Sequence, residues 1–408
     1  MRLSPLCRRL LTAVACAAVL LPGPAAGAAS TGAASTAIKG PNGVFLAVSC
    51  PTASWCMAVG WFNRADRTRR PLAETWDGTA WRLASPPNPA GAIDSTLTAV
   101  SCVSPSSCQA VGGTMRSEGT FTKPATKSAL LEHWDGTSWR REPARLPFRS
   151  EEATSVSCTT ATMCVVVGEH VTAAARQSIP FSARWDGQRW TALPVPRPAL
   201  VTELNGVSCP GSHSCYAVGD RAASLAIPVH PLVLHWDGSR WHRLAVPGAP
   251  RRAIFRAVSC PTLTDCTVVG KAGGDASFSR MLVEDLNKGR WTTSRPPVPG
   301  AAAPGTTEFT AVSCSEPQVC TALLNYLHPA PAGGDAWATA SRDASGGFVV
   351  TIPAGNVSAG EVSGVSCQPS ACTVAGVQGT IASGGKTLAL RGKDGHFTRQ
   401  HTQNEPAG

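Results

Sequence analysis

Residues 97–112 of the chain read LTAVSCVSPSSCQAVG: a β-prone run ending in Val-Ser-Cys, a turn, and a second β-prone run that begins with cysteine. The chain repeats this pattern seven times, with five residues, once four, between the two cysteines. Successive copies begin 51 to 56 residues apart. A regular period of this length is typical of repeat architectures, in which supersecondary units stack to bury a shared core. The repeat therefore predicts the fold before any single residue is considered.

The cysteines of the repeat account for all but two of the 16 cysteines in the chain, and the other two, Cys7 and Cys16, lie near the N-terminus. In an exported protein, an even set of regularly spaced cysteines favours disulfides, here one for each copy. Dithiol metal sites are the alternative, but no histidine recurs with the repeat to complete a ligand set. The expected pairs are Cys50 with Cys56, Cys102 with Cys108, Cys158 with Cys164, Cys209 with Cys215, Cys260 with Cys266, Cys314 with Cys320, and Cys367 with Cys372.

The N-terminus has the pattern of a secretory signal peptide. Basic residues precede an apolar run at 10–21 that is too short to span a bilayer, and Ala26-Gly27-Ala28 supplies a small-residue cleavage site. Removal of residues 1–28 takes away three arginines, so the formal net charge falls from +10 to about +7. We expect a secreted, extracellular protein with no transmembrane segment. Arg8-Arg9 leaves the choice between general and twin-arginine export open.

One repeat reads as four short strands. In the second copy these are residues 97–102, 108–112, 129–134 and 138–141, with the turn signal Asp135-Gly136 between the last two. Seven such units predict an all-β fold, a seven-bladed β-propeller with four antiparallel strands and one disulfide in each blade. The first strand, which is rich in small residues, suits the crowded centre, and the Trp-rich fourth strand suits the rim. A β-helix is the alternative, but its rungs are shorter.

The repeat also sets the expected boundaries. A signal peptide at 1–28 and a flexible leader at 29–44 precede the propeller at 45–400, and a tail follows at 401–408. Each disulfide is expected to stiffen a hairpin inside its blade, which leaves contact between blades to apolar residues such as Val100 and its equivalents. The blades are expected at about 45–95, 96–151, 152–202, 203–253, 254–307, 308–360 and 361–400.

The first four copies carry Trp-Asp-Gly-x-x-Trp, beginning at Trp76, Trp134, Trp185 and Trp236. Glycine tolerates the positive φ of a hairpin turn, and an aspartate side chain can accept hydrogen bonds from the backbone N–H groups of the turn. Here the chain resembles the Asp-box propellers of the sialidase-like superfamily, and it is also similar to kelch-type propellers. The resemblance spans about 45–400 and implies a structural role for the turn aspartates, which are Asp77, Asp135, Asp186 and Asp237.

The two faces of such a propeller differ. Turns between strands one and two and between strands three and four are short and share one face, which we call the short-loop face. The other connections are longer and vary between copies, and we call their side the long-loop face, where binding is expected. Six residues before the first cysteine, four of the seven copies have a glutamate where strand one begins at the mouth of the channel: Glu152, Glu203, Glu308 and Glu361.

These four glutamates are the candidate ligand-binding residues. Clustered carboxylates can hold Ca²⁺ or act as an acid and base pair, although a solvated charge at a strand end is the simpler interpretation. A structural calcium ion is the only cofactor we consider. Sialidase chemistry is not expected, because it requires an arginine triad and a tyrosine–glutamate nucleophile pair. The chain has only two tyrosines, Tyr216 and Tyr326. No phosphate loop or nucleophile elbow occurs. The histidines His170, His230 and His328 are expected in long loops, at the surface.

We therefore expect a secreted, non-catalytic binding propeller that recognises carbohydrate or cell-envelope material through its long-loop face. Its partners would be an extracellular glycan, a cell-envelope polymer or a protein. Scattered basic residues without interleaved aromatics do not indicate nucleic-acid binding, and we expect a monomer. The alternatives are a glycoside hydrolase or lyase that uses the channel-mouth glutamates, and an extracellular protein-interaction scaffold.

Overall fold

The computed structural model of the chain separates into two units, Met1–Ile38 and Lys39–Gly408. All described residues belong to the second unit, so the expected signal peptide lies outside them. The first strand begins at Gly43, inside the expected leader. In the described ranges, no helix has the length and apolar character needed to cross a membrane. The described residues are 42–117, 126–142, 151–172, 177–197, 199–223, 229–273, 280–300, 302–303, 305–329, 333–342, 346–353, 360–381 and 384–403.

The described residues form strands and no helix, in sets of four that follow one another along the chain. The first four sets are β1 (Gly43–Thr52), β2 (Trp55–Asn63), β3 (Arg69–Trp76) and β4 (Trp81–Leu83); β5 (Asp94–Ser104), β6 (Ser107–Ser117), β7 (Thr126–Trp134) and β8 (Trp139–Arg141); β9 (Glu151–Thr160), β10 (Met163–Thr172), β11 (Gln177–Trp185) and β12 (Trp190–Leu193); β13 (Val201–Gly211), β14 (Ser214–Ala222), β15 (His230–Trp236) and β16 (Trp241–Leu244).

The remaining sets follow the same order. They are β17 (Ala253–Thr262), β18 (Asp265–Ala272), β19 (Arg280–Asn287) and β20 (Arg290–Ser294); β21 (Glu308–Glu316), β22 (Val319–Leu327), β23 (Asp335–Arg342) and β24 (Phe348–Thr351); β25 (Glu361–Gln368), β26 (Ala371–Thr380), β27 (Gly384–Lys393) and β28 (His396–Gln400).

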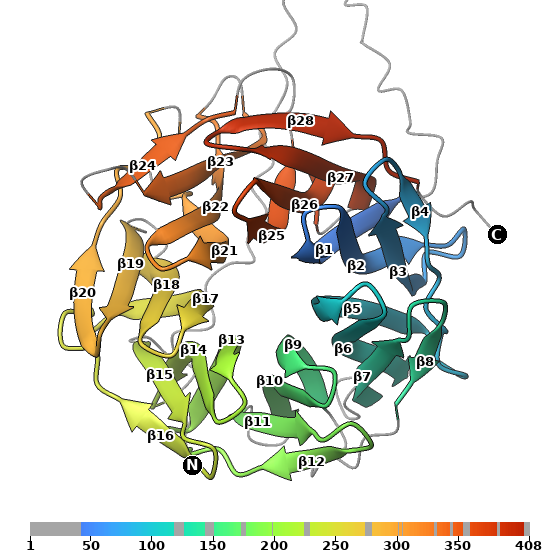
Figure 1. The fold of residues 1–408 in the computed structure, drawn as a ribbon, viewed down its shortest axis with the longest axis horizontal. Helices are drawn as coiled ribbons and strands as arrows, with labels where there is room; N and C mark the ends of the chain where they lie inside the picture. The colour runs from blue at the N-terminus through green and yellow to red at the C-terminus, as the bar shows by residue number, and fades with distance from the viewer. Residues whose placement is uncertain are drawn as a thin grey trace, which may run out of the picture. The chain divides into compact units, whose positions relative to one another are not determined.

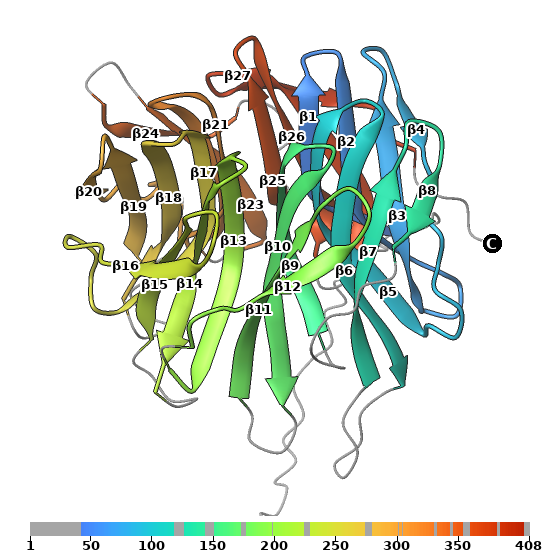
Figure 2. The same cartoon turned by 60° about the horizontal axis from the view of Figure 1, so that its bottom comes forward.

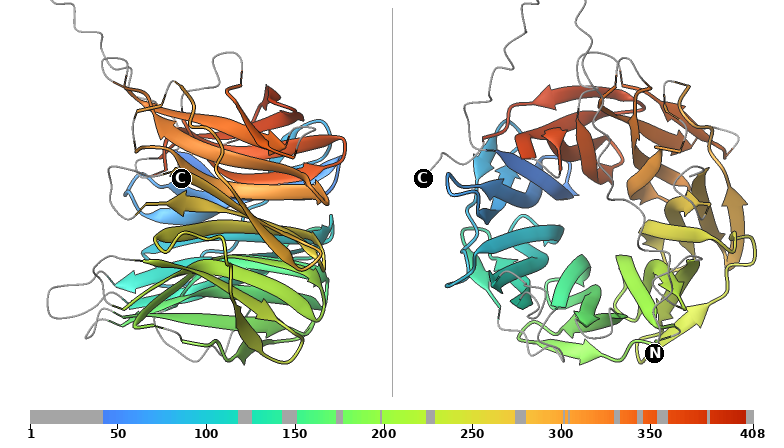
Figure 3. Two further views of the ribbon diagram at one scale, coloured as in Figure 1. Left: turned by 90° about the vertical axis from the view of Figure 1, so that its left-hand side faces the viewer. Right: turned by 180° about the vertical axis from the view of Figure 1, so that it is seen from behind.

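Within the second unit, the sets stand as blades around a common centre, and this arrangement fits the expected seven-bladed β-propeller (Figure 1). The first strand of each set borders the centre and the fourth forms the rim, as predicted. Figure 2 places the hairpins between first and second strands at one end of the blades, and Figure 3 gives the side view and the view from behind. The ring closes where β1 meets blade seven, with Gly43 paired to Gly385 of β27.

The second strands extend beyond the glycine at which we expected them to end. In blade two, β6 continues past Gly112 to Ser117. A Cβ added at Gly112 would lie 2.0 Å from the carbonyl oxygen of Thr96, where the pairing of β5 and β6 shifts by a bulge. Only glycine allows this close approach of two backbones. The glycine thus marks a bulge inside the hairpin and does not mark its end.

All seven expected disulfides are confirmed. Each joins the first and second strands of one blade, with Cα atoms 3.9 to 4.1 Å apart. The pair with the shorter loop, Cys367 and Cys372, forms like the others because these cysteines lie directly opposite each other in the β25–β26 register.

The serine of each Val-Ser-Cys triplet joins its blade to the next, and we call the seven hydrogen bonds that these serines accept the serine ring. The Ser101 hydroxyl, for example, accepts a hydrogen bond of 2.9 Å from the backbone N–H of Cys158 in the following blade. Our expectation that only apolar packing holds the blades together is therefore wrong. The other six bonds run from Cys102 to Ser49, Cys209 to Ser157, Cys260 to Ser208, Cys314 to Ser259, Cys367 to Ser313, and, closing the ring, Cys50 to Ser366.

A second set of contacts between blades lies nearer the long-loop face. Thr98 donates a hydrogen bond of 2.6 Å to the carbonyl oxygen of Ala153 in the next blade. Blade five has Arg256 at the equivalent position, and this residue instead reaches Glu308 of blade six through an ion pair. Equivalent hydrogen bonds join Thr154 to Leu204, Asn205 to Phe255, Thr310 to Val362, and Ser363 to Phe45.

Replacement of one serine of this ring by alanine is expected to lower the free energy of unfolding, because the serine accepts a hydrogen bond from the next blade. The variant Ser208→Ala leaves the backbone N–H of Cys260 without its partner, which costs about 1–3 kcal/mol of unfolding free energy. Denaturant unfolding would measure the loss, with Ser212→Ala, in an exposed turn, as the control. Equal stability of the two variants would show that the ring contributes nothing measurable.

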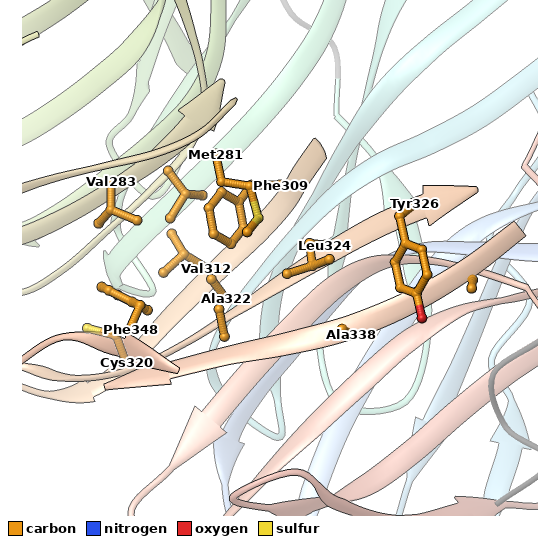
Figure 4. Packing of buried hydrophobic residues seen from close by; sticks show 13 residues of the cluster. Met281, Val283, Phe309, Val312, Cys320, Ala322, Leu324, Tyr326, Ala338 and Phe348 are labelled. Atoms are coloured by element: carbon orange, nitrogen blue, oxygen red, sulfur yellow. The ribbon is translucent and has the colours of Figure 1, made fainter. Parts of the chain in front are cut away.

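Apolar side chains fill the space between neighbouring blades. Between blades five and six, Phe309 packs with Met281 and Val283 of β19 and with Val312 of its own strand (Figure 4). All four are buried. Similar clusters occupy the other interfaces. Burial of this surface supplies most of the favourable free energy of the fold.

The turn aspartates hold the hairpins at the rim of the short-loop face. Asp77 accepts hydrogen bonds from the backbone N–H groups of Thr79 and Ala80, at 2.9 and 2.8 Å, and Gly78 has a φ of +96°. These bonds, with that of the Thr79 hydroxyl, hold the pKa of the Asp77 carboxyl far below its usual range. Trp76 and Trp81 flank the turn with ring centroids 5.9 Å apart. The same turn recurs at Asp135, Asp186 and Asp237.

Candidate functional site

The four channel-mouth glutamates lie where the sequence places them, at the beginning of first strands on the long-loop face. Each has different neighbours. Glu152 forms an ion pair of 3.0 Å with Lys127 of the preceding blade. Glu361 accepts a hydrogen bond of 3.1 Å from the backbone N–H of Ile381. Burial raises the pKa of Glu361 against the effect of that bond. The structure thus gives the glutamates separate partners.

Glu203 and Glu308 belong to a charged cluster on blades four to six. Glu203 lies directly opposite Asp220 in the β13–β14 pairing. Glu308 forms ion pairs with Arg256 at 2.5 Å and with Lys271 at 3.2 Å. We call these five residues the mouth cluster. Three of its members, Asp220, Arg256 and Lys271, were missed by the sequence analysis.

The two glutamates of the mouth cluster differ in protonation. Burial, together with the negative charges of Asp220 and Glu169, raises the pKa of Glu203 to about 7. Burial alone would also raise the pKa of Glu308, but Arg256 and Lys271 outweigh it and lower that pKa. Near neutral pH, Glu203 is therefore partly protonated while Glu308 is ionised. A difference of this kind between two carboxyl groups is the pattern that acid and base catalysis uses.

A cavity of about 210 Å³ opens beside Glu152, between blades one, two and three. Arg69, Asp94, Lys127 and Glu152 bring charges of both signs to its wall, and Thr96, Thr114 and Met115 complete it with Gly113. Gly113 leaves room for Glu152, because a Cβ there would lie 3.3 Å from the Glu152 side chain. Charged groups of both signs around a volume of this size can hydrogen-bond the hydroxyl groups of one sugar ring.

Two further cavities lie at the rim of the same face. One, of about 460 Å³, is lined by Lys386, Arg399 and His401 together with Thr387, Gln400 and Thr402. The other, of about 200 Å³, lies beside Arg221 and Arg243 of blade four. All three cavities thus lie on the long-loop face, opposite the disulfides, where the first strand of each blade begins and the second strand ends.

The calcium hypothesis stays a prediction. In the part of the chain that the structure describes, no group of three or more His, Cys, Asp or Glu side chains is placed to hold a metal ion. The histidine placement was partly wrong, because His170 lies in β10 and His230 in β15, whereas His328 follows β22. These strands run further toward the long-loop face than the glycine signals suggested.

No family model and no curated protein matches the sequence. Solved structures do match by fold. The GH74 xyloglucanase from Xanthomonas campestris superposes with a TM-score of 0.52 at 13% identity, over 86% of this chain and 52% of that chain. This chain thus spans about half the length of the xyloglucanase.

A PL25 ulvan lyase superposes with a TM-score of 0.52 at 10% identity, over 83% of this chain and 92% of that chain. The β-propeller domain of the Trilobed protease from Pyrococcus furiosus has a TM-score of 0.48 at 9% identity, over 90% of this chain and 100% of that domain. At such identities these likenesses concern the fold alone. The chain shares its architecture with β-propeller proteins.

Proposed function

We propose that the mature chain is a secreted, non-catalytic binding propeller that recognises carbohydrate or cell-envelope polymer through its long-loop face. The observation that carries the proposal is the position of the three cavities described above, all on that face. The short-loop face is occupied by disulfide turns and by hairpins whose aspartate side chains already accept hydrogen bonds from the turn backbone. Rigid scaffolds with variable connections on one face commonly bind there.

The lining of the cavities favours a polar, extended ligand. A volume of about 210 Å³ with charges of both signs suits one sugar ring, and a polymer could place successive units in several shallow cavities. The xyloglucanase and the ulvan lyase carry saccharide substrates on related scaffolds, as their names state. Kinship with Asp-box and kelch-type propellers remains part of this proposal and rests on the short turn motifs.

The second candidate is a glycoside hydrolase or lyase. It is favoured by one observation, the split between a Glu203 carboxyl with a pKa of about 7 and an ionised Glu308 joined to Arg256. In this function Glu203 would donate a proton and Glu308 would accept one. The non-catalytic proposal is preferred because burial and neighbouring protein charges already account for the pKa shifts of Glu203 and Glu308. The different protonation of the two carboxyl groups therefore does not require a catalytic role.

One experiment separates these functions. We expect the mature protein to bind neutral or anionic glycans, or purified cell-wall fragments, that are immobilised on an array. We also expect it to leave the length of these polymers unchanged. Release of new reducing ends or unsaturated products by the wild type, lost in Glu203→Gln, would favour the enzyme. Binding to a protein but to no glycan or wall fragment would favour the scaffold and contradict the proposal.

A further inference from the structure

The ionisable side chains that line the cavity beside blade four are all basic. Its wall contains Arg221 from β14, His230 from β15, Arg243 from β16, and Arg251 from the connection to β17. No carboxylate is among the described residues that line it. In the sequence from 221 to 264, the only acidic residue is Asp237, which caps the turn at the opposite end of the blade and contacts His242. We call this cavity the arginine cavity.

Arg221 is the central residue of the arginine cavity. It lies directly opposite His230 in the β14–β15 pairing, and its Nε atom is buried without a hydrogen-bond partner. Burial and the nearby positive charge of Arg243 lower the pKa of the Arg221 guanidinium. Grouping cations without an acid is unfavourable, and so is leaving a buried donor unpaired. Both costs are relieved when an anion binds between the guanidinium groups.

The rest of the wall is apolar and is held in place. Pro231, Leu244, Val246 and Pro250 contribute carbon surface. The connection turns back on itself through a hydrogen bond of 3.1 Å from the N–H of Ala249 to the carbonyl oxygen of Val246. It also lies against β20, because a Cβ added at Gly248 would be 2.1 Å from Oγ1 of Thr293. The cavity therefore exists before any ligand arrives, which limits the entropy lost on binding.

We propose that the arginine cavity binds an oxyanion carried on a polysaccharide, a sulfate, carboxylate or phosphate group, with the C–H face of the sugar against Pro231 and Pro250. Guanidinium groups match such oxyanions with paired hydrogen bonds. This inference rests on the proposed function and narrows its ligand to an anionic glycan. A neutral glycan would leave the arginines without a partner, so it is expected to bind more weakly.

The test compares four immobilised polymers: dextran sulfate, polygalacturonate, poly(glycerol phosphate) and neutral dextran. We expect the mature protein to bind at least one anionic polymer, and neutral dextran at least about tenfold more weakly. The double variant Arg221→Gln/Arg243→Gln should lose about tenfold or more in affinity for that anionic polymer. Arg243→Gln alone, which alters an exposed side chain, should lose part of it, so that the result does not depend on the fold of the double variant.

The matched control is Arg82→Gln/Arg189→Gln, which removes the same charge from exposed side chains on the short-loop face. We expect its affinity to stay within about twofold of the wild type. Equal losses in both double variants would overturn the proposal, because net charge alone would then explain the binding. Binding of neutral dextran or other neutral glycans that is unaffected by the arginine variants would overturn this inference and leave the proposed function intact. Binding to none of the polymers, glycans or wall fragments would overturn both.

Discussion

At pH 8, the Glu132→Leu variant is expected to be more stable than the wild type, by about 4 kcal/mol of unfolding free energy. Glu132 is fully buried on β7, and neither carboxyl oxygen has a hydrogen-bond partner. Burial raises its pKa to about 8, against the weaker effect of Arg141. At pH 8 the folded protein must therefore hold a buried proton or a buried charge, whereas the unfolded chain ionises freely.

Glu74 and Glu284 are buried as well, although each accepts one hydrogen bond, from the Gln403 N–H and the Thr293 hydroxyl respectively. Burial raises the pKa of Glu74 to about 8 and that of Glu284 to about 7. These folded-state pKa values lie above the value of about 4.5 for an unfolded chain. At a pH between the unfolded and the folded pKa, the folded protein therefore binds more protons than the unfolded chain. The stability of the wild type should thus fall as the pH rises from about 4.5 to 8.

Matched variants make this prediction specific. Blade four has Leu234 where blade two has Glu132, two residues before the tryptophan of the turn, so leucine fits the position. The reverse change, Leu234→Glu, should lower stability at pH 8 and much less at pH 4.5. Thermal and denaturant unfolding across this range would measure both. A gain for Glu132→Leu that is equal at pH 4.5 and pH 8 would contradict the buried-proton explanation.

Complete reduction is expected to unfold the domain under conditions where the oxidised protein is folded. Each disulfide closes a loop with a sequence separation of 5 or 6 residues, and one such ring contributes roughly 2 kcal/mol in the loop-entropy model. Seven rings together approach or exceed the whole stability of a typical domain, which is about 5–15 kcal/mol. Reduction leaves the donors and acceptors of the serine ring in place. However, these groups belong to the first strands, which the disulfides hold against the second strands, so the ring is expected to weaken when the disulfides are lost.

Tryptophan fluorescence during heating, with and without dithiothreitol, would measure this effect, and a thiol count would confirm reduction. The variant Cys102→Ala/Cys108→Ala removes one disulfide and should lose only about 2 kcal/mol. An unchanged melting temperature after complete reduction would mean that packing and the serine ring alone determine stability.

The repeat made most of the fold predictable, because its cysteines, turn glycines and tryptophans recur at fixed positions. The strand order, the disulfides and the location of the glutamates at the beginning of first strands follow from one aligned copy. The bridging role of Ser101 and its equivalents was missed, although alternation along the strand places serine on the face opposite Val100. Contacts between blades depend on how neighbouring sheets are set around the ring, which one repeat does not contain.

The sites were less predictable for the same reason. Glu308 was found by alignment, but its partners Arg256 and Lys271 come from the blade before it. The arginine cavity combines three strands and a connection, and no other copy has arginine at both the Arg221 and the Arg243 positions. Its one sequence signal is the long stretch after Arg221 in which Asp237 is the only acid.

Side-chain footprinting with hydroxyl radicals, with and without the tightest-binding glycan, tests most directly the claim that the long-loop face binds ligand. Met115 and His230 line cavities on that face. On the short-loop face, Leu263 in a turn and Val319 at the beginning of β22 are exposed by 56% and 47%. We predict that the glycan protects Met115 or His230 and leaves Leu263 and Val319 unchanged. Protection confined to Leu263 and Val319 would contradict the account.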